Sequence, residues 1–244
     1  MVRGFEELSN NAWPALQTLQ YDGWTLRIAN GVTKRSNSVN MLYPSTLNPL
    51  DKIAFCEQFY LARGLPACFK VTGLADPPQI DDLLESLGYA VHSVISFQVK
   101  DLGAGGGDPS GEIRLENDPR VEWMDDFIRM NGFDPARRET YLAILSQVLT
   151  PKCLASKVIE GKTVAVGLAV AERGYAGLFD IVVDPAHRHQ GLGYNVVNEL
   201  LCWGRRQGAH TAYLQVLADN APALGLYRKM GFTEAYRYWY RMKP

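Results

Sequence analysis

Apolar and polar residues alternate in a regular series along the C-terminal half of the chain. Strand-like runs show a period of two, and longer runs show helical spacing of their apolar positions. Three of the strands are joined by the dipeptides Glu160-Gly161 and Arg173-Gly174, which is typical of an antiparallel meander. The pattern predicts, in order, strand 112–116, helices 119–131 and 135–149, strands 153–160, 163–172 and 175–183, a helix ending near 208, strand 211–216, helix 220–230 and strand 233–242.

The N-terminal half shows a similar mixture of helical and strand periods. Residues 4–21 are predicted as a helix, because Leu8, Trp13, Leu16 and Leu19 fall broadly on one side, although Pro14 interrupts it. An Asn-Gly pair at 30–31 predicts a hairpin between the strands on either side of it. The predicted elements after the first helix are strands 23–29 and 36–43, helix 51–63, strand 67–71, helix 79–87 and strand 90–102.

The two halves are separated by residues 103–111, which contain five glycines and one proline. Such a composition cannot form a regular element and is typical of a flexible linker. We therefore expect an accessory domain over 1–102, a linker over 103–111 and a second domain over 112–244.

The composition excludes several classes of protein. The 244 residues are 47% hydrophobic and 21% charged, with a net charge of −1, so no general attraction to nucleic acid or to an anionic membrane is expected. No apolar run approaches the length of a membrane span, and the first residues do not resemble a signal peptide, so we expect a cytoplasmic protein. The four cysteines form no metal-binding or disulfide pattern, and no metal is expected.

The most informative stretch is 178–194, where a β-branched run ends at Asp184-Pro185 and a basic, glycine-rich segment leads into a helix. The free N–H groups and the dipole at a helix N-terminus favour phosphate groups, and glycines allow their close approach. The spacing Arg188-x-x-Gly191-x-Gly193 matches neither the nucleoside-triphosphate loop nor the dinucleotide fingerprint.

This segment resembles the pyrophosphate-binding signature of the GNAT superfamily of acyl-CoA N-acyltransferases. A second segment strengthens the resemblance: Asn220 begins a short helix that continues through Leu226-Tyr227 and ends at Gly231-Phe232. The order of elements after residue 111 is also that of the GNAT fold. The resemblance implies an α/β protein with a mixed sheet that opens between strands 175–183 and 211–216, where the coenzyme enters.

The resemblance also assigns roles to individual residues. Tyr227 would protonate the departing sulfur. Asp180 is a candidate base or amine ligand by position only, and a water-mediated base is the alternative. The structural alternatives are that Tyr227 packs on the terminal strand, and that Asp180 is a carboxylate on a sheet edge or paired with a nearby arginine. Gln215 stands where some members carry a glutamate base. The residues expected to bind acetyl-CoA are Ile181, Val182, Val183, Arg188, His189, Gln190, Gly191, Leu192, Gly193, Tyr194 and Asn220.

The N-terminal half resembles a degenerate copy of the same domain, as in two-lobed GNAT proteins. The run Leu83 to Tyr89, which ends in Gly-Tyr before a strand, echoes Leu226 to Phe232. Residues 43–50 occupy the place of the glycine-rich segment but contain no glycine and no arginine, and Leu84 stands at the place of Tyr227. One acyl-CoA site, in the C-terminal half, is therefore expected.

Together these features indicate an acetyl-CoA-dependent N-acetyltransferase that acts on a primary amine of a small molecule or peptide. Two alternatives stay open: an acyl-CoA sensor without transfer, which Gln215 favours, and an interaction protein on an inactive scaffold. The sequence leaves open whether the chain is a monomer or a homodimer, and neither nucleic acid nor a membrane is expected as a partner.

Overall fold

The computed structural model describes residues 1–103, 109 and 111–243 and divides into two compact units. The first unit comprises Met1–Ser96, Leu217–Asp219 and the chain from Tyr236 onward, and the second comprises Phe97–Val216 and Asn220–Ala235. Most of the predicted linker at 103–111 lies outside the described residues. No helix in the described part of the chain is long and apolar enough to cross a bilayer.

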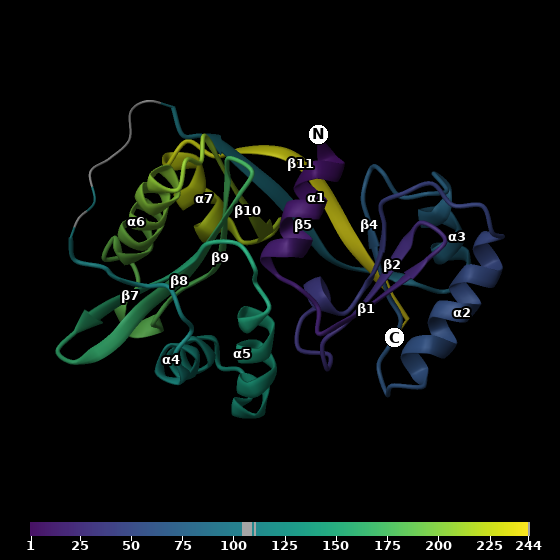
Figure 1. Cartoon of the computed structure of the whole chain (residues 1–244), viewed down its shortest axis with the longest axis horizontal. Coiled ribbons are helices and arrows are strands. Elements are labelled where there is room, and N and C mark those ends of the chain that lie inside the picture. The colour runs from purple at the N-terminus through teal and green to yellow at the C-terminus, as the bar shows by residue number, and fades with distance from the viewer. Residues whose placement is uncertain (104–108, 110, 244) are drawn as a thin grey trace. The chain divides into compact units, whose positions relative to one another are not determined.

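The second unit is built on the strand order β5-β10-β9-β8-β7-β6, with helices on both faces (Figure 1). Helix α6 packs on β7, β8 and β9, and α4 packs against β8 and β9 from the other side. The elements of this unit are β6 (Arg114–Glu116), α4 (Val121–Asn131), α5 (Arg138–Ser146), β7 (Lys152–Ile159), β8 (Lys162–Glu172), β9 (Tyr175–Val183), α6 (Leu192–Arg206), β10 (Thr211–Leu217) and α7 (Ala221–Lys229).

The predicted antiparallel meander is confirmed, because β7 pairs with β8 and β8 pairs with β9 in antiparallel register. Both connecting turns have two successive residues with positive φ, at Glu160-Gly161 (50° and 78°) and Arg173-Gly174 (50° and 78°). This backbone matches the twist of a two-residue hairpin, and the glycine supplies its second residue at no steric cost.

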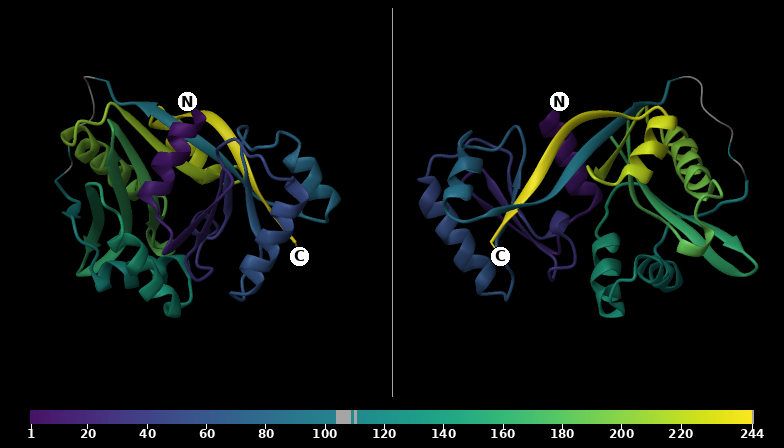
Figure 2. Two further views of the ribbon diagram at one scale, coloured as in Figure 1. Left: turned by 45° about the vertical axis from the view of Figure 1, so that its right-hand side comes forward. Right: turned by 180° about the vertical axis from the view of Figure 1, so that it is seen from behind.

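The first unit contains the strand order β1-β2-β3-β4-β11. Helices α2 and α3 cover one face of this sheet, where Ile53, Tyr60 and Leu84 join the apolar core. Figure 2 shows α1 on the opposite face of the same strands. The elements of this unit are α1 (Val2–Ala12), β1 (Gln17–Tyr21), β2 (Trp24–Ile28), β3 (Val39–Met41), α2 (Pro49–Leu61), β4 (Cys68–Val71) and α3 (Ile80–Ser86).

Two strands, β5 (Ala90–Asp101) and β11 (Thr233–Met242), contribute to both units. Strand β5 enters the second unit at Phe97, and β11 enters the first unit at Tyr236. Within the first unit, β11 pairs with β4 from Trp239↔Val71 to Met242↔Cys68. The C-terminal strand is thus an integral part of the N-terminal unit.

The predicted helix at 4–21 is wrong in its second half. Helix α1 ends at Ala12, and residues 17–21 form β1, which pairs with β2 through a turn at Asp22-Gly23. Pro14 lacks the N–H that an α-helix needs and restricts its predecessor to extended backbone, so the helix ends before it. The predicted strand 36–43 is also shorter, since Lys34–Ser36 form a 3₁₀ turn and only Val39–Met41 are extended.

Candidate active site

The glycine-rich segment forms a turn that leads from β9 into α6 by way of the 3₁₀ turn Pro185–His187. Gly191 precedes the helix with a left-handed backbone (φ 79°), and His189 is also left-handed (φ 62°). A Cβ built on Gly191 would meet nothing within 4 Å. The segment therefore presents its backbone to open space at the N-terminus of a helix of 15 residues.

The first turn of α6 offers backbone donors that the helix does not use. The hydrogen bond from Asn195 N to Gly191 O (3.1 Å) is the first of the helical ladder. The N–H groups of Leu192, Gly193 and Tyr194 thus have no acceptor within the helix, and the helix dipole makes this end positive. Arg188, earlier in the same turn, is exposed, and its Nε donates to Val183 O at 3.4 Å. These groups fit the pyrophosphate of a coenzyme A thioester.

Strand β9 carries a β-bulge just before this segment. Its register with β8 shifts between Phe179↔Leu168 and Val182↔Val166, so Asp180 and Ile181 together face the single residue Gly167. Asp180 has a positive φ of 52°, which a non-glycine residue rarely adopts within a strand. A bulge leaves one residue out of the ladder and turns the following backbone, and this one redirects the end of β9.

The two central parallel strands separate at the same level. Strands β9 and β10 pair from Tyr175↔Thr211 to Leu178↔Leu214, but β9 continues to Val183 and β10 to Leu217. The half-buried residues Ile181, Val182 and Val183 follow the last of these pairs. Backbone groups on this side of β9 are available to a ligand, as expected for the opening through which an acyl-CoA enters.

Asp184 fixes the end of β9, and the sequence analysis did not assign it a role. Its N–H donates to Val164 O (2.8 Å), and its carboxylate accepts from Ala186 N (3.1 Å), Arg129 Nη1 (2.9 Å) and Lys162 Nζ (3.1 Å). The hydrogen bond from Ala186 and the nearby cations hold the pKa of Asp184 well below its usual range. An Asp-Pro pair after a strand is the sequence signal for such a cap.

Helix α7 lies against the start of α6. A Cβ built on Gly193 would lie 3.3 Å from Leu226 Cδ2 and 3.7 Å from Val183 Cγ2, so the end of β9, the first turn of α6 and α7 meet here. Asn220 caps α7 through its side chain, which accepts from Ala223 N at 3.2 Å. Tyr227, one residue after Leu226, is 7% exposed and its ring contacts Phe232. Burial raises the pKa of its hydroxyl to about 12.

The residues expected to bind acetyl-CoA thus lie on consecutive segments: the bulged end of β9, the turn, the start of α6, and α7. Of those in the turn, the exposed residues are Arg188, His189, Gln190, Gly191 and Tyr194. Leu192 points into the core and can contribute only its backbone. Gln215 lies on β10 just beyond the last pair with β9.

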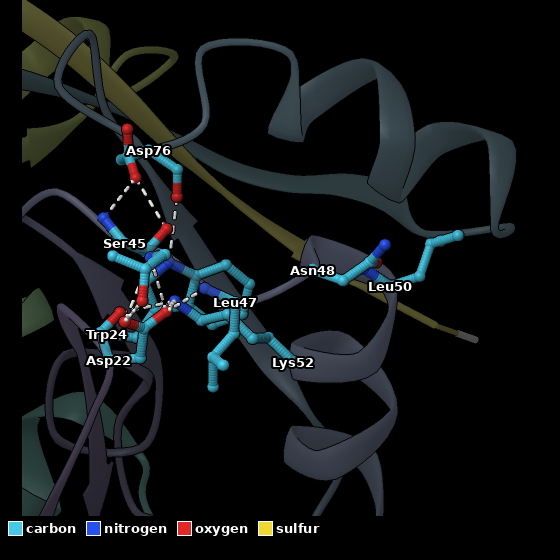
Figure 3. A network of polar contacts seen from close by, with 9 residues as sticks. Asp22, Trp24, Ser45, Leu47, Asn48, Leu50, Lys52 and Asp76 are labelled. Atoms are coloured by element: carbon cyan, nitrogen blue, oxygen red, sulfur yellow. Dashed lines mark hydrogen bonds and ion pairs between the residues drawn. The ribbon is translucent and has the colours of Figure 1, made fainter.

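The corresponding loop of the first unit is filled by its own carboxylates (Figure 3). Asp22 accepts from Thr46 N (2.9 Å) and Leu47 N (2.9 Å), and the buried Lys52 Nζ contacts it at 3.1 Å. Asp76 accepts from Ser45 N at 2.7 Å. These backbone donors precede α2, and the hydrogen bonds with Leu47 and Thr46 and the contact with Lys52 lower the pKa of Asp22. Aspartate side chains therefore accept the backbone hydrogen bonds that a phosphate at this loop would need.

Solved structures with the same fold define the class. A GCN5-related N-acetyltransferase from Kribbella flavida covers 100% of this chain, with 96% of its own length matched, a TM-score of 0.69 and 13% identity. A tandem GNAT protein from the clavulanic acid biosynthesis pathway covers 97% of this chain, with 86% of its own length matched, a TM-score of 0.63 and 14% identity. The chain has the GNAT fold in its tandem form, and the predicted α/β mixed fold is confirmed.

The sequence comparisons then give the particular family. Residues 1–241 match the family model described as "Probable histone acetyltransferase Rv0428c C-terminal", and the chain belongs to this family of acetyltransferases. The uncharacterized N-acetyltransferase YobR of Bacillus subtilis is 33% identical over 99% of this chain and 98% of its own length. The ribosomal protein bS18-alanine N-acetyltransferase of Escherichia coli is 39% identical over 31% of this chain and 51% of its own length. The relatives support acyl transfer as the general activity.

Proposed function

We propose that the protein transfers the acetyl group of acetyl-CoA to a primary amine by direct attack within a ternary complex. The observation that carries this proposal is the turn 188–194, which exposes unused N–H groups, Gly191 and Arg188 at the N-terminus of α6. It stands beside the bulge of β9 and the separation of β9 from β10. A thioester held on this turn could extend its acyl end along β9.

In the proposed reaction the neutral amine nitrogen attacks the thioester carbonyl carbon, a C–N bond forms and the C–S bond breaks. Backbone N–H groups of the segment Ile181–Val183 would stabilise the negative charge that develops on the carbonyl oxygen. Tyr227 would give its hydroxyl proton to the departing sulfur, and Asp180 would take the proton that the amine loses. Because burial raises the pKa of Tyr227 to about 12, its hydroxyl stays protonated at neutral pH, as a proton donor must.

The coenzyme would be held by the turn and by α7. The backbone N–H groups of Leu192, Gly193 and Tyr194, with Arg188 of the same turn, suit the pyrophosphate. Asn220 already uses Oδ1 to cap α7, so a contact with the pantetheine arm would use its Nδ2 group.

The test of this proposal is the pair Gly191→Asp and Gly191→Asn. Both side chains face open space and have the same size and backbone strain, so only the charge differs. A carboxylate against the pyrophosphate costs several kcal/mol, and we expect Gly191→Asp to raise the Kd for acetyl-CoA by at least about 100-fold. Gly191→Asn should bind acetyl-CoA more tightly than Gly191→Asp does, and this difference should account for most of the roughly 100-fold change.

The measurement is isothermal calorimetry, supported by thermal unfolding with acetyl-CoA. Wild type should gain roughly 2.7 kcal/mol of stability at a hundredfold excess over Kd. Equal affinity of the two variants would show that no phosphate lies at Gly191.

Gln215 supports a second candidate, a protein that binds acyl-CoA without transferring the acyl group. An amide cannot accept the amine proton as a glutamate would. Release of free thiol from acetyl-CoA in the presence of a panel of primary amines separates the two candidates. Coenzyme binding without thiol release for any amine would favour the sensor.

A further inference from the structure

Strands β2, β3, β4 and β11 of the first unit present one apolar and one polar face, and both faces carry buried residues. Side chains that are paired in register point to the same face of a sheet. Thr25 pairs with Asn40, Asn40 with Lys70, and Lys70 with Tyr240, so these four form a row across β2, β3, β4 and β11. Each of them is at most 9% exposed. The neighbouring residues Phe69 and Val71 point to the apolar face instead.

Helix α1 supplies polar partners to this face. Glu6, which is fully buried, accepts from Lys70 Nζ through Oε2 and from Tyr236 OH through Oε1 at 2.7 Å. Arg27, two residues after Thr25 on the same face, donates to Asn10 Oδ1 and to the backbone oxygen of Arg35 at 2.6 Å. Each of these hydrogen bonds between α1 and the sheet thus involves a charged group.

The charges on this face do not balance. Arg27 and Lys70 are two buried cations, and Glu6 is the one carboxylate that meets them among the described residues. The hydrogen bonds of Arg27 go to uncharged oxygens, and burial lowers its pKa to about 10. Burial also lowers the pKa of Lys70, against the effect of Glu6. An uncompensated buried cation is costly, and an added anion would relieve it.

Polar atoms on this face also lack partners. The amide of Asn40 is oriented by its Nδ2 group, which donates to Ser38 O at 3.2 Å and contacts Ser38 Oγ at 3.1 Å. Its Oδ1 is buried and has no hydrogen-bond partner among the described residues, and the same holds for the hydroxyl of Tyr240. Burial, and after it Cys68, raise the pKa of Tyr240, and the side chain of Tyr238 lowers it, although no hydrogen bond of normal geometry joins the two hydroxyl groups. Lys70, which lies between Asn40 and Tyr240, has three donors and one hydrogen bond to Glu6, and its Nζ lies 4.0 Å from the centroid of the Tyr238 ring.

We propose that this polar face, between α1 and strands β3, β4 and β11, binds a small carboxylate that also carries a hydroxyl or amino group. The carboxylate would accept from Lys70 and Tyr240 and balance the second cation. The hydroxyl or amino group would donate to Asn40 Oδ1. Such a ligand would balance the charge of this face and supply hydrogen-bond partners to its unpaired atoms. A purely structural network would leave those hydrogen bonds unmade.

The experiment measures thermal unfolding and calorimetric binding of the full chain with glycolate and with L-serine as probes. Acetate lacks the second donor, ethylene glycol lacks the carboxylate, and potassium chloride controls for ionic strength. The test variants are Tyr240→Phe and Asn40→Leu. Tyr21→Phe also removes a tyrosine hydroxyl, but from the apolar side of the sheet, where the ring of Tyr21 stacks on Phe55. This variant serves as the matched control.

We expect saturable binding of glycolate or L-serine to wild type and to Tyr21→Phe, with acetate and ethylene glycol bound at least tenfold more weakly. Tyr240→Phe should weaken binding about three- to tenfold, the effect of one hydrogen bond. Without a probe, Tyr240→Phe should unfold at the same or a higher temperature than wild type, because the hydroxyl it removes has no partner.

Two results would overturn the proposal. One is no saturable binding of either probe, which would mean that only water meets these atoms. The other is equal binding by wild type and both test variants. Because binding is measured without coenzyme, failure of the proposed acetyl transfer leaves this test intact.

Discussion

Tyr227 shows how the surroundings of one side chain set its chemistry. It is buried on α7, its ring meets Phe232, and no hydrogen bond to its hydroxyl is found in the described part of the chain. Burial raises its pKa because the phenolate would lose its hydration. The hydroxyl therefore stays protonated at neutral pH, as its proposed role as proton donor to the departing sulfur requires.

Replacement of Tyr227 by phenylalanine should lower kcat about 100-fold and leave the Kd for acetyl-CoA nearly unchanged, because only proton donation is lost. Since its pKa is about 12, the protonated form is lost only as pH rises through that value, and Tyr227 should cause no fall in kcat below about pH 10. Steady-state kinetics and a pH profile from 6 to 10 check both points. An alkaline limb that disappears in Tyr227→Phe would contradict the assignment.

Asp184 should control the geometry of the turn through its hydrogen bonds. Asp184→Asn removes the charge that Arg129 and Lys162 meet, so we expect a lower unfolding temperature and weaker acetyl-CoA binding at pH 7. Asp126→Asn is the matched control, because Asp126 contacts the same Arg129 at 2.7 Å but not the turn.

The pH dependence gives a second check on Asp184. Its folded pKa is depressed below 3.8, so its stabilising effect is complete above that value and is lost as pH falls below it. The difference in unfolding temperature between wild type and Asp184→Asn should therefore be largest near neutral pH and shrink below pH 3.8. A difference that grows on acidification would contradict the role of the carboxylate.

At the scale of elements, α6 is positioned by the small residue beneath it. A Cβ on Gly167 of β8 would lie 2.8 Å from Val196 Cγ1 and 3.0 Å from Leu200 Cδ1, both on α6. The same glycine faces the bulge of β9. One position therefore governs how closely the helix that carries the turn approaches the strand that carries the bulge.

Gly167→Ala should destabilise the fold by about 1–3 kcal/mol through overpacking, which lowers the unfolding temperature by about 2–10 °C. Gly4→Ala in α1 is the control, because its Cβ would meet nothing within 4 Å and alanine favours the helix by about 0.5–1 kcal/mol. Differential scanning calorimetry measures both. An unchanged unfolding midpoint for Gly167→Ala would show that α6 can move away from the added methyl group without loss of stability.

Sequence patterns predicted elements well where local and tertiary preferences agree. The meander was predictable because Glu160-Gly161 and Arg173-Gly174 suit tight hairpins. The turn before α6 was predictable because Arg188, Gly191 and Gly193 lie within one short segment of the sequence. Residues 17–21 were assigned to a helix because their apolar positions fit that period, whereas their pairing with β2 decides the structure. The bulge at Asp180 had no sequence signal, since it depends on Gly167 of another strand.

At the scale of the whole molecule, the tandem fold contains one turn suited to a phosphate and one that is filled. Asp22 and Asp76 take the backbone donors of residues 45–47, and Lys52 neutralises Asp22. The sequence indicated the loss of glycine and arginine at 43–50, but the two aspartates come from distant parts of the chain and could not be connected to it in advance. The first unit thus lacks free donors for a coenzyme at this loop.

Calorimetry should accordingly find one acetyl-CoA per chain in wild type. Gly191→Asp should then show none at the same concentrations, because no second turn can replace the first. A stoichiometry of two, or residual tight binding in Gly191→Asp, would place a coenzyme in the first unit and contradict the role given to Asp22.

The passage of β5 and β11 through both units has a consequence for how such a protein can change. A fragment that begins at residue 112 lacks Phe97–Asp101 of β5, the neighbour of β10, and carries the strand that belongs beside β4. Either fragment would expose an unpaired strand edge, which is prone to aggregation. Separation or exchange of the halves at 103–111 would therefore take a strand segment away from the sheet of each unit.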